Sequence, residues 1–252
     1  MIDINTDAEN TIRRFGTARI LEHLLAIVTF GVLVVTGLSQ KFFSLNVSQW
    51  LILTLGGIDT VRLIHRYAGV VFTLALSAHV LINVTGIILR KWQPSMLINK
   101  NDFTDAVHDI RYYSGLENFP SHCDRYGYKQ KFEYWGILTG GLLMMATGII
   151  LWFPTTATRL LPGELIPAAK ALHSNEALVI VLLIAVWHIY NSIFSPEVFP
   201  LDTSIFTGYI SGERMLREHP LELARIEVKK GAGMTNQLTE GIGGIKQEGT
   251  SS

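Results

Sequence analysis

The sequence predicts an all-α membrane protein folded as a four-helix transmembrane bundle, and three observations support this fold class. Hydrophobic residues make up 48% of the 252-residue chain and charged residues only 17%, below the roughly 25% of a soluble domain. The apolar residues gather in four long blocks, and most charged residues lie between the blocks. Each block is close to the roughly 20 residues that a helix needs to cross a bilayer. The net charge of zero argues against nucleic acid as a partner.

The four blocks define the predicted elements in chain order. The spans are residues 20–38, 63–89, 135–153 and 168–194. A weaker apolar stretch at residues 47–58 is too short to span, so we expect an interfacial or re-entrant piece there. The expected organisation is a cytoplasmic N-terminal segment (1–19), a transmembrane domain (20–210), a cytoplasmic cap (211–230) and a disordered tail (231–252).

The distribution of positive charge predicts the orientation of the bundle. Sixteen of the 21 Lys and Arg residues lie in the N-terminal segment, the loop between spans two and three, or the C-terminal segment. Because cytoplasmic segments carry the excess of positive charge, both termini are expected in the cytoplasm. No cleavable signal peptide is expected, since a polar segment precedes the first span and no small-residue cleavage site follows it.

Histidines in the predicted spans are the candidate functional residues, because ionisable groups at membrane depth are costly. His65 and His79 share one face of span two, roughly 21 Å apart at about 1.5 Å per residue. His173 and His188 are similarly spaced on span four. The predicted topology puts His65 and His173 in an outer layer. It puts His23, at the start of span one, in an inner layer with His79 and His188.

Two layers of facing imidazoles in a four-helix bundle fit two stacked haems, each with two histidine ligands. A single transition-metal site would instead gather its ligands in one sphere. A proton pathway is favoured by carboxylates among the intramembrane groups, and we find only Glu22 and Glu176 near the predicted spans. We therefore predict two haem b groups and keep a cofactor-free proton channel or transporter as the alternative.

Short stretches in a fixed order over residues 12–220 also resemble a known family. They are Glu22-His23, Ile64-His65-Arg66, Tyr126-x-x-x-Gln130-Lys131 with Trp135, His173, Trp187-His188-Ile189-Tyr190, Phe206-Thr207-Gly208-Tyr209-Ile210-Ser211 and Glu218-His219-Pro220. This ordered set resembles the cytochrome b (gamma) subunit of membrane-bound formate dehydrogenases and, more widely, the hydrogenase-type di-haem cytochrome b family.

The resemblance implies which histidines hold the two haems. Carried over by position, His65 and His173 would ligate the outer haem, and His23 and His188 the inner haem. His79 departs from the family pattern and leaves an alternative open. The matched spacing on two helices is also similar to the cytochrome b of the quinol–cytochrome c reductase family, in which His79 would take the place of His23. The opening of span one favours His23.

The resemblance further implies a quinone site and a redox partner. Menaquinone or ubiquinone would bind beside the inner haem, near Tyr126 and Gln130. Gly127 stands where the family has an asparagine. The partner would be an iron–sulfur or multihaem subunit of a membrane-bound dehydrogenase or reductase complex, in the bacterial inner membrane. The predicted function is electron transfer between that partner and the quinone pool, without catalysis by this chain alone. The alternative is a haem-bearing anchor without its own quinone site, which passes electrons to another haem protein.

Overall fold

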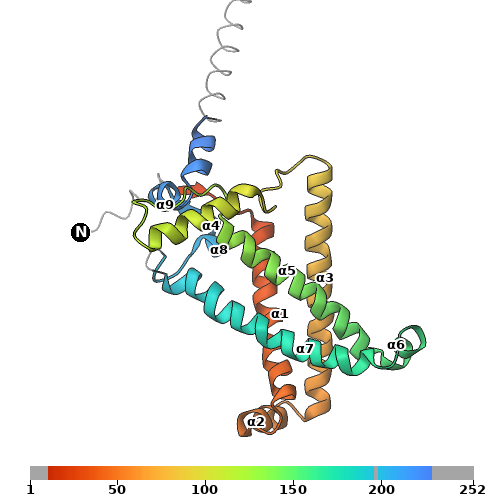
Figure 1. The fold of residues 1–252 in the computed structure, drawn as a ribbon. Helices are drawn as coiled ribbons and strands as arrows, with labels where there is room; N and C mark the ends of the chain where they lie inside the picture. Colours follow the sequence, from red (N-terminus) through yellow and green to blue (C-terminus); the bar gives the residue numbers. More distant parts are fainter. Residues whose placement is uncertain (1–10, 196–197, 229–252) are drawn as a thin grey trace, which may run out of the picture. The chain divides into compact units, whose positions relative to one another are not determined.

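The computed structural model describes residues 11–195 and 198–228, and these form two compact units that we describe separately (Figure 1). The larger unit contains residues 13–94 and 132–209, and it holds the membrane helices. The smaller unit contains residues 95–131 and the described residues on either side of the chain, 11–12 and 210–228. The predicted disordered tail at residues 231–252 lies outside the described residues.

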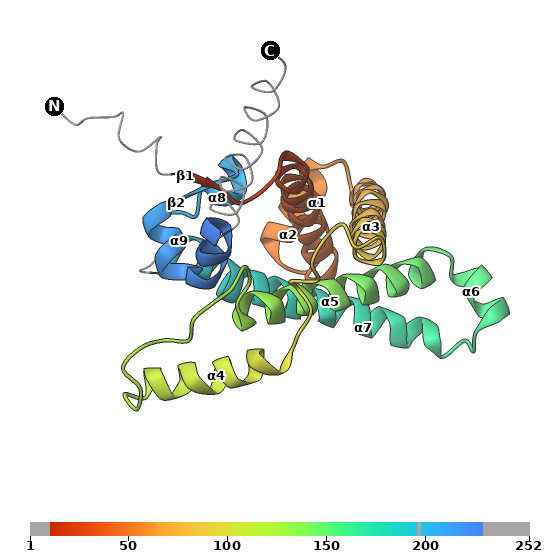
Figure 2. The same cartoon turned by 90° about the horizontal axis from the view of Figure 1, so that it is seen from above.

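The larger unit confirms the predicted fold class, because the described residues include four helices long and apolar enough to cross a membrane. These are α1 (Thr17–Lys41), α3 (Ile58–Ile88), α5 (Tyr128–Trp152) and α7 (Leu165–Leu182), which η2 (Leu183–His188) and η3 (Tyr190–Phe194) continue. Figure 2 shows α1 beside α3, and α5 beside α7. In the most apolar window of each span, at most 17% of the residues are buried. The remaining apolar side chains therefore face outward, as a lipid environment requires.

Glycines let neighbouring helices of the bundle approach closely. A Cβ at Gly141 on α5 would lie 3.2 Å from Leu76 on α3. A Cβ at Gly140, on the other side of α5, would lie 3.0 Å from Ile180 on α7. Small residues at such positions allow the backbones to pack, which is the usual way that membrane helices associate.

The membrane helices end where the sequence interrupts the helical backbone. Gly56 and Gly57 precede α3 with φ values of 91° and 100°, a left-handed conformation that only glycine adopts at low cost. Pro154, which follows α5, is the first residue of the short helix α6 (Pro154–Leu160). The stretch expected to be interfacial or re-entrant forms α2 (Asn46–Thr54), whose nine residues cover only about 14 Å and cannot span.

A tight turn joins the start of α1 to the end of the larger unit. The backbone N–H groups of Arg14 and Phe15 both donate to the carbonyl oxygen of Gly208, at 2.8 and 3.1 Å. Gly208 follows the short helix α8 (Ser204–Thr207) with φ of 86°, and a Cβ there would lie 2.9 Å from the Phe15 carbonyl oxygen. The strands β1 (Thr11–Arg13) and β2 (Tyr209–Ser211) pair beside this turn. Because of its positive φ and this close approach, only glycine suits position 208.

The smaller unit is built on charged groups as much as on apolar packing. It contains α4 (Lys100–Tyr113) and α9 (Gly212–Glu218). The side chains of Asn99 and Asp102 form a capping box at the start of α4. Asp102 also accepts from Lys131 Nζ at 2.8 Å, and both residues are buried, with 8% and 6% exposure. The segment between spans two and three thus contains a helix and a buried ion pair.

Candidate functional site

The first pair of intramembrane histidines faces across the bundle. His65 lies near the start of α3 and His173 lies on α7, and their ring centroids are 6.4 Å apart with an interplanar angle of 77°. These residues are more than 100 positions apart in the sequence, so the fold alone brings them together. The two histidines that are predicted to lie in one layer therefore face each other.

A threonine hydroxyl holds each ring of this pair in one tautomer. Thr36 Oγ1 lies 2.9 Å from His65 Nδ1, and Thr147 Oγ1 lies 2.9 Å from His173 Nδ1. Each hydroxyl also donates its own proton to a carbonyl oxygen four residues back in its helix, at 2.6 and 2.8 Å. The hydroxyl oxygen must therefore accept the proton of Nδ1. This arrangement leaves Nε2 of both rings unprotonated and free to bind a metal.

A glycine beside each threonine makes room for the imidazole. A Cβ at Gly37 would lie 3.2 Å from Cε1 of His65, and a Cβ at Gly148 would lie 3.4 Å from Cε1 of His173. The same Thr-Gly dipeptide therefore serves both rings, from α1 in one case and from α5 in the other. The sequence alone does not reveal the role of these threonines, because Thr-Gly is a common dipeptide and each threonine contacts a histidine 26 or 29 residues away in the chain.

The second pair lies at the other end of the bundle. His23 near the start of α1 and His188 at the end of η2 have ring centroids 6.1 Å apart and an interplanar angle of 55°. The ring of Phe206 contacts His23 edge-on at 6.5 Å. His188 belongs to a π-helical stretch, a local widening of the helix that is frequent at functional sites. Two of the three histidines of the predicted inner layer thus face each other.

A carboxylate takes the place of the threonine at the second pair. Glu133 Oε1 on α5 lies 2.5 Å from Nδ1 of His188, so the ring donates its Nδ1 proton and leaves Nε2 free. The Nδ1 atom of His23 is buried and has no hydrogen-bond partner in the described part of the chain. Glu133 escapes the sequence analysis because the predicted third span starts at residue 135, two positions after it. A carboxylate near a span was nevertheless a detectable signal.

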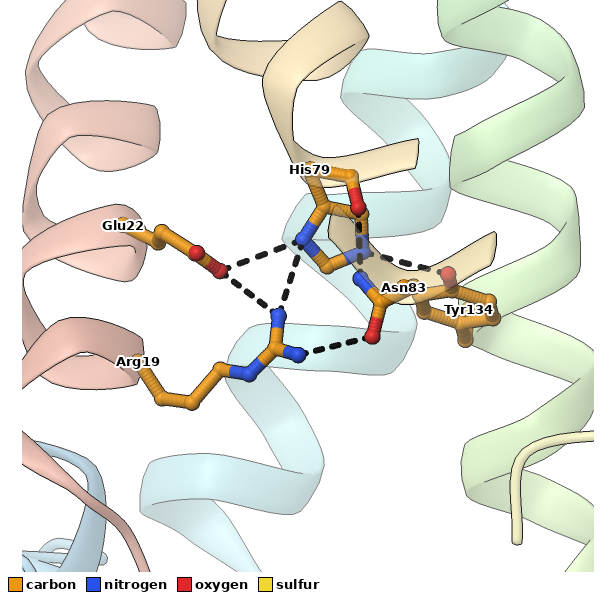
Figure 3. Close-up of polar contacts among 5 residues, drawn as sticks. All are labelled: Arg19, Glu22, His79, Asn83 and Tyr134. Carbon is orange, nitrogen blue, oxygen red and sulfur yellow. Dashed lines mark hydrogen bonds and ion pairs between the residues drawn. The ribbon is translucent and has the colours of Figure 1, made fainter. Parts of the chain in front are cut away.

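His79, the third member of the predicted inner layer, is engaged differently. Its Nδ1 lies 3.2 Å from both Arg19 Nη1 and Glu22 Oε2, and its Nε2 lies 3.1 Å from the hydroxyl of Tyr134 (Figure 3). Arg19 Nη2 also donates to Asn83 Oδ1 at 2.7 Å. Both ring nitrogens of His79 therefore have polar partners, whereas Nε2 of the paired histidines is available.

The two predicted quinone contacts belong to the smaller unit. Gln130 Oε1 accepts a hydrogen bond from the backbone N–H of Gly127 at 3.1 Å. The guanidinium of Arg125 lies over the ring of Tyr126, 5.6 Å from its centroid, and donates to Glu222 at 2.6 Å. Burial alone would lower the pKa of Arg125, but the neighbouring Tyr126 and Glu222 raise that pKa above its ordinary value. The quinone role of Tyr126 and Gln130 stays a prediction.

The paired histidines fit the axial positions of a haem. Two imidazoles on opposite sides of one metal, each with its nitrogen about 2 Å from it, have ring centroids about 6 Å apart. The centroids of the two pairs are 6.4 and 6.1 Å apart. Among the described residues, no group of three or more His, Cys, Asp or Glu side chains could hold a metal ion. Four membrane-spanning helices with two such pairs define a class of protein, the membrane cytochromes b.

Comparison with known proteins gives the family within this class. A sequence model described as prokaryotic cytochrome b561 matches residues 14–208, so the chain belongs to that family. The chain is 28% identical to the cytochrome b556(fdo) subunit of formate dehydrogenase from Escherichia coli K12, over 84% of this chain and 91% of that protein. It is 21% identical to the cytochrome b556(Fdn) subunit of nitrate-inducible formate dehydrogenase from the same strain, over 82% and 89% of the two chains.

The family and the fold together establish the general role of the chain. It is a multi-pass protein of the bacterial inner membrane, and its family implies haem b and electron transport. The sequence-based identification of a formate dehydrogenase-type cytochrome b is confirmed.

Proposed function

We propose that this chain is a di-haem membrane anchor that carries electrons between a redox partner and the membrane quinone pool. The observation that carries the proposal is the presence of two facing histidine pairs at opposite ends of one helical bundle. Haem b, when bound, supplies a one-electron carrier at each level. The side chains of this protein hold those carriers at fixed positions and set the polarity around them.

At each level, the haem would be held by two histidines that belong to two different helices. His65 and His173 hold one haem, and His23 and His188 hold the other. The tautomers fixed by Thr36 and by the other Nδ1 partners support this assignment, since they leave Nε2 unprotonated. With both termini in the cytoplasm, the His65 level lies near the outer surface and the His23 level near the inner surface.

The choice of His23 over His79 rests on hydrogen bonding. Both nitrogens of the His79 ring already have partners within 3.2 Å, on two other helices. A ring that ligates iron gives up one nitrogen to the metal and keeps only the other for a protein group. The ring of His23, by contrast, faces His188 at a separation suited to a shared metal. His23 is therefore the better candidate.

The partner and the substrate follow from the relatives and the topology. The relatives are named as cytochrome subunits of formate dehydrogenases. By analogy, the electron-transfer subunit of a membrane-bound dehydrogenase, with iron–sulfur or haem centres, would dock at the outer level. Menaquinone or ubiquinone would react at the inner level, with Tyr126 and Gln130 as the contacts that the family resemblance suggests.

Haem stoichiometry in purified variants tests the ligand assignment. His173→Ala and His188→Ala should each retain about one haem per chain, because a bis-histidine site that loses one ligand loses its haem. His79→Ala should retain two, and His108→Ala, on α4 of the smaller unit, is the matched control. Two haems in His173→Ala would contradict the assignment. If His79→Ala loses a haem and His23→Ala keeps two, then His79 and not His23 is the inner ligand.

The quinone step needs a separate measurement. The reduced complex should be oxidised by a soluble quinone such as decylubiquinone, and a quinone-site inhibitor should block that oxidation. Haems that react with an inorganic oxidant but not with any quinone would instead favour an anchor without its own quinone site.

A further inference from the structure

A cluster of polar side chains near the inner histidine pair has no part in the proposed haem ligation. Figure 3 shows these residues converging from three helices, α1, α3 and α5. Its members are Arg19, Glu22, His79, Asn83 and Tyr134. Such a group is costly within a membrane helix bundle and calls for a function.

The partners of His79 satisfy the ring in either neutral tautomer. When Nδ1 carries the proton it donates to Glu22 Oε2 at 3.2 Å, and Nε2 accepts from the Tyr134 hydroxyl at 3.1 Å. When Nε2 carries the proton it donates to the same Tyr134 oxygen, and Nδ1 accepts from Arg19 Nη1 at 3.2 Å. A change of tautomer therefore exchanges one hydrogen bond at Nδ1 for another, keeps the contact with Tyr134 and moves no heavy atom. A ring with this property can take up a proton at one nitrogen and release one at the other.

The groups around the ring keep it in place while its protons move. Arg19 is fixed by Glu22 at 2.8 Å and by Asn83 at 2.7 Å, and its guanidinium lies 5.5 Å from the Trp92 ring. Asn83 in turn donates to the backbone carbonyl of His79 at 2.7 Å. The side chains of His79 and Glu22 are 25% and 33% exposed, so the Nδ1 side of the ring is not closed off by other side chains of the protein.

Two residues of the cluster are sequence neighbours of residues at the inner histidine pair. Glu22 immediately precedes His23 on α1, and Tyr134 immediately follows Glu133, which binds His188. The Nδ1 side of His79 thus faces the start of α1, and its Nε2 side faces the helix that supports His188. A proton that leaves through Nε2 emerges on α5, next to the residue that holds the inner ligand.

We infer that His79 and Tyr134 form a proton relay that supplies the quinone reaction at the inner level, and this inference rests on the proposed quinone function. A quinone becomes a quinol when it takes up two electrons and two protons. In each passage a proton from water adds at Nδ1 of His79, and the Nε2 proton moves to the Tyr134 oxygen. Tyr134 releases its hydroxyl proton toward the quinone. A half-turn of the imidazole about its Cβ–Cγ bond then brings the remaining proton back to the Tyr134 side and restores the starting state, and the reverse order carries protons away during quinol oxidation.

The test separates proton delivery from electron transfer. The haems of the purified complex with the full chain are reduced, and their oxidation is followed optically after mixing with decylubiquinone or with ferricyanide, which accepts no proton. His79→Ala and Tyr134→Phe should slow the quinone reaction by about tenfold or more, as expected for loss of a proton-transfer group. Oxidation by ferricyanide and the haem content should match wild type. His108→Gln should behave as wild type in both reactions.

Chemical rescue distinguishes a relay from a structural role. Added imidazole should restore part of the quinone rate in His79→Ala, because the small base can occupy the space of the lost ring. His79→Gln, which keeps one hydrogen-bonding group without a titrating ring, should remain slow.

Three results would overturn one or other part of this account. Wild-type haems that no quinone oxidises would refute the proposed quinone function itself. A wild-type quinone rate in His79→Ala would refute the relay and leave that function intact. An equal slowing of the ferricyanide and quinone reactions in His79→Ala, without rescue by imidazole, would assign His79 a structural role.

Discussion

If His23 and His188 hold a haem as proposed, replacing Glu133 with glutamine should raise the redox potential of that inner haem. The carboxylate accepts the Nδ1 proton of His188 at 2.5 Å and makes the ring a more basic ligand, which stabilises the ferric state. Glutamine has nearly the same shape and keeps an acceptor oxygen, but it carries no charge. A hydrogen bond to a charged group is worth about 1–2 kcal/mol more than a neutral one. Since a tenfold change in a one-electron equilibrium is about 59 mV, the potential should rise by roughly 40–90 mV.

A potentiometric titration of the purified complex measures this effect directly. Optical spectra recorded at set potentials give the midpoint of each haem in wild type and in Glu133→Gln. The proposed haem at His65 and His173 provides an internal reference, because both of these rings have neutral threonine hydroxyls from other helices at Nδ1. Glu117→Gln, at a carboxylate that pairs with Arg111 in the smaller unit, is the matched control. An inner potential that stays constant or falls, or an equal shift of both haems, would refute the reasoning.

Two further variants test the packing of the bundle and of the smaller unit. Gly37→Ala puts a methyl group 3.2 Å from the His65 ring, so it should weaken haem retention at that level by about 1–3 kcal/mol, seen as earlier haem loss on heating. Gly31→Ala, on the same helix with no neighbour within 4 Å, should have no such effect. Lys131→Met leaves Asp102 buried without its ion-pair partner and should destabilise the smaller unit by about 3–5 kcal/mol, seen as faster proteolysis between residues 95 and 131. Unchanged proteolysis would show that this ion pair contributes little.

The membrane helices are the part of the fold that the sequence predicts best. All four expected spans occur as helices, because long apolar blocks have no stable alternative in lipid. The boundaries are less accurate. Span three is expected from residue 135, but α5 begins at Tyr128, since its first turns carry charged residues that hydropathy excludes. The helix α4 was not predicted either, because the loop that contains it has no long apolar run.

In the candidate site, the sequence predicts the positions of the histidines but not the side chains that orient their rings. The spacing of His65, His173, His23 and His188 along their helices is enough to predict two layers. The groups that orient the rings cannot be found this way. Glu133 lies 55 residues from the histidine that it contacts, so its place beside a span marks it as a candidate but does not identify its partner. Hydrogen-bond partners of this kind depend on helix rotation, which periodicity alone does not fix.

The two histidine pairs differ in the groups that accept their Nδ1 protons, and this difference affects the direction of electron transfer. At the outer level both ligands donate to neutral hydroxyl groups, whereas at the inner level one ligand donates to a carboxylate. With other factors equal, the proposed inner haem would have the lower potential and would be the stronger reductant toward a quinone. An uphill step of about 60 mV between the haems reduces the population of the inner carrier only tenfold. Continuous removal of electrons by a quinone overcomes that factor, so a carboxylate at this position favours quinone reduction at the inner end without stopping transfer from the outer haem.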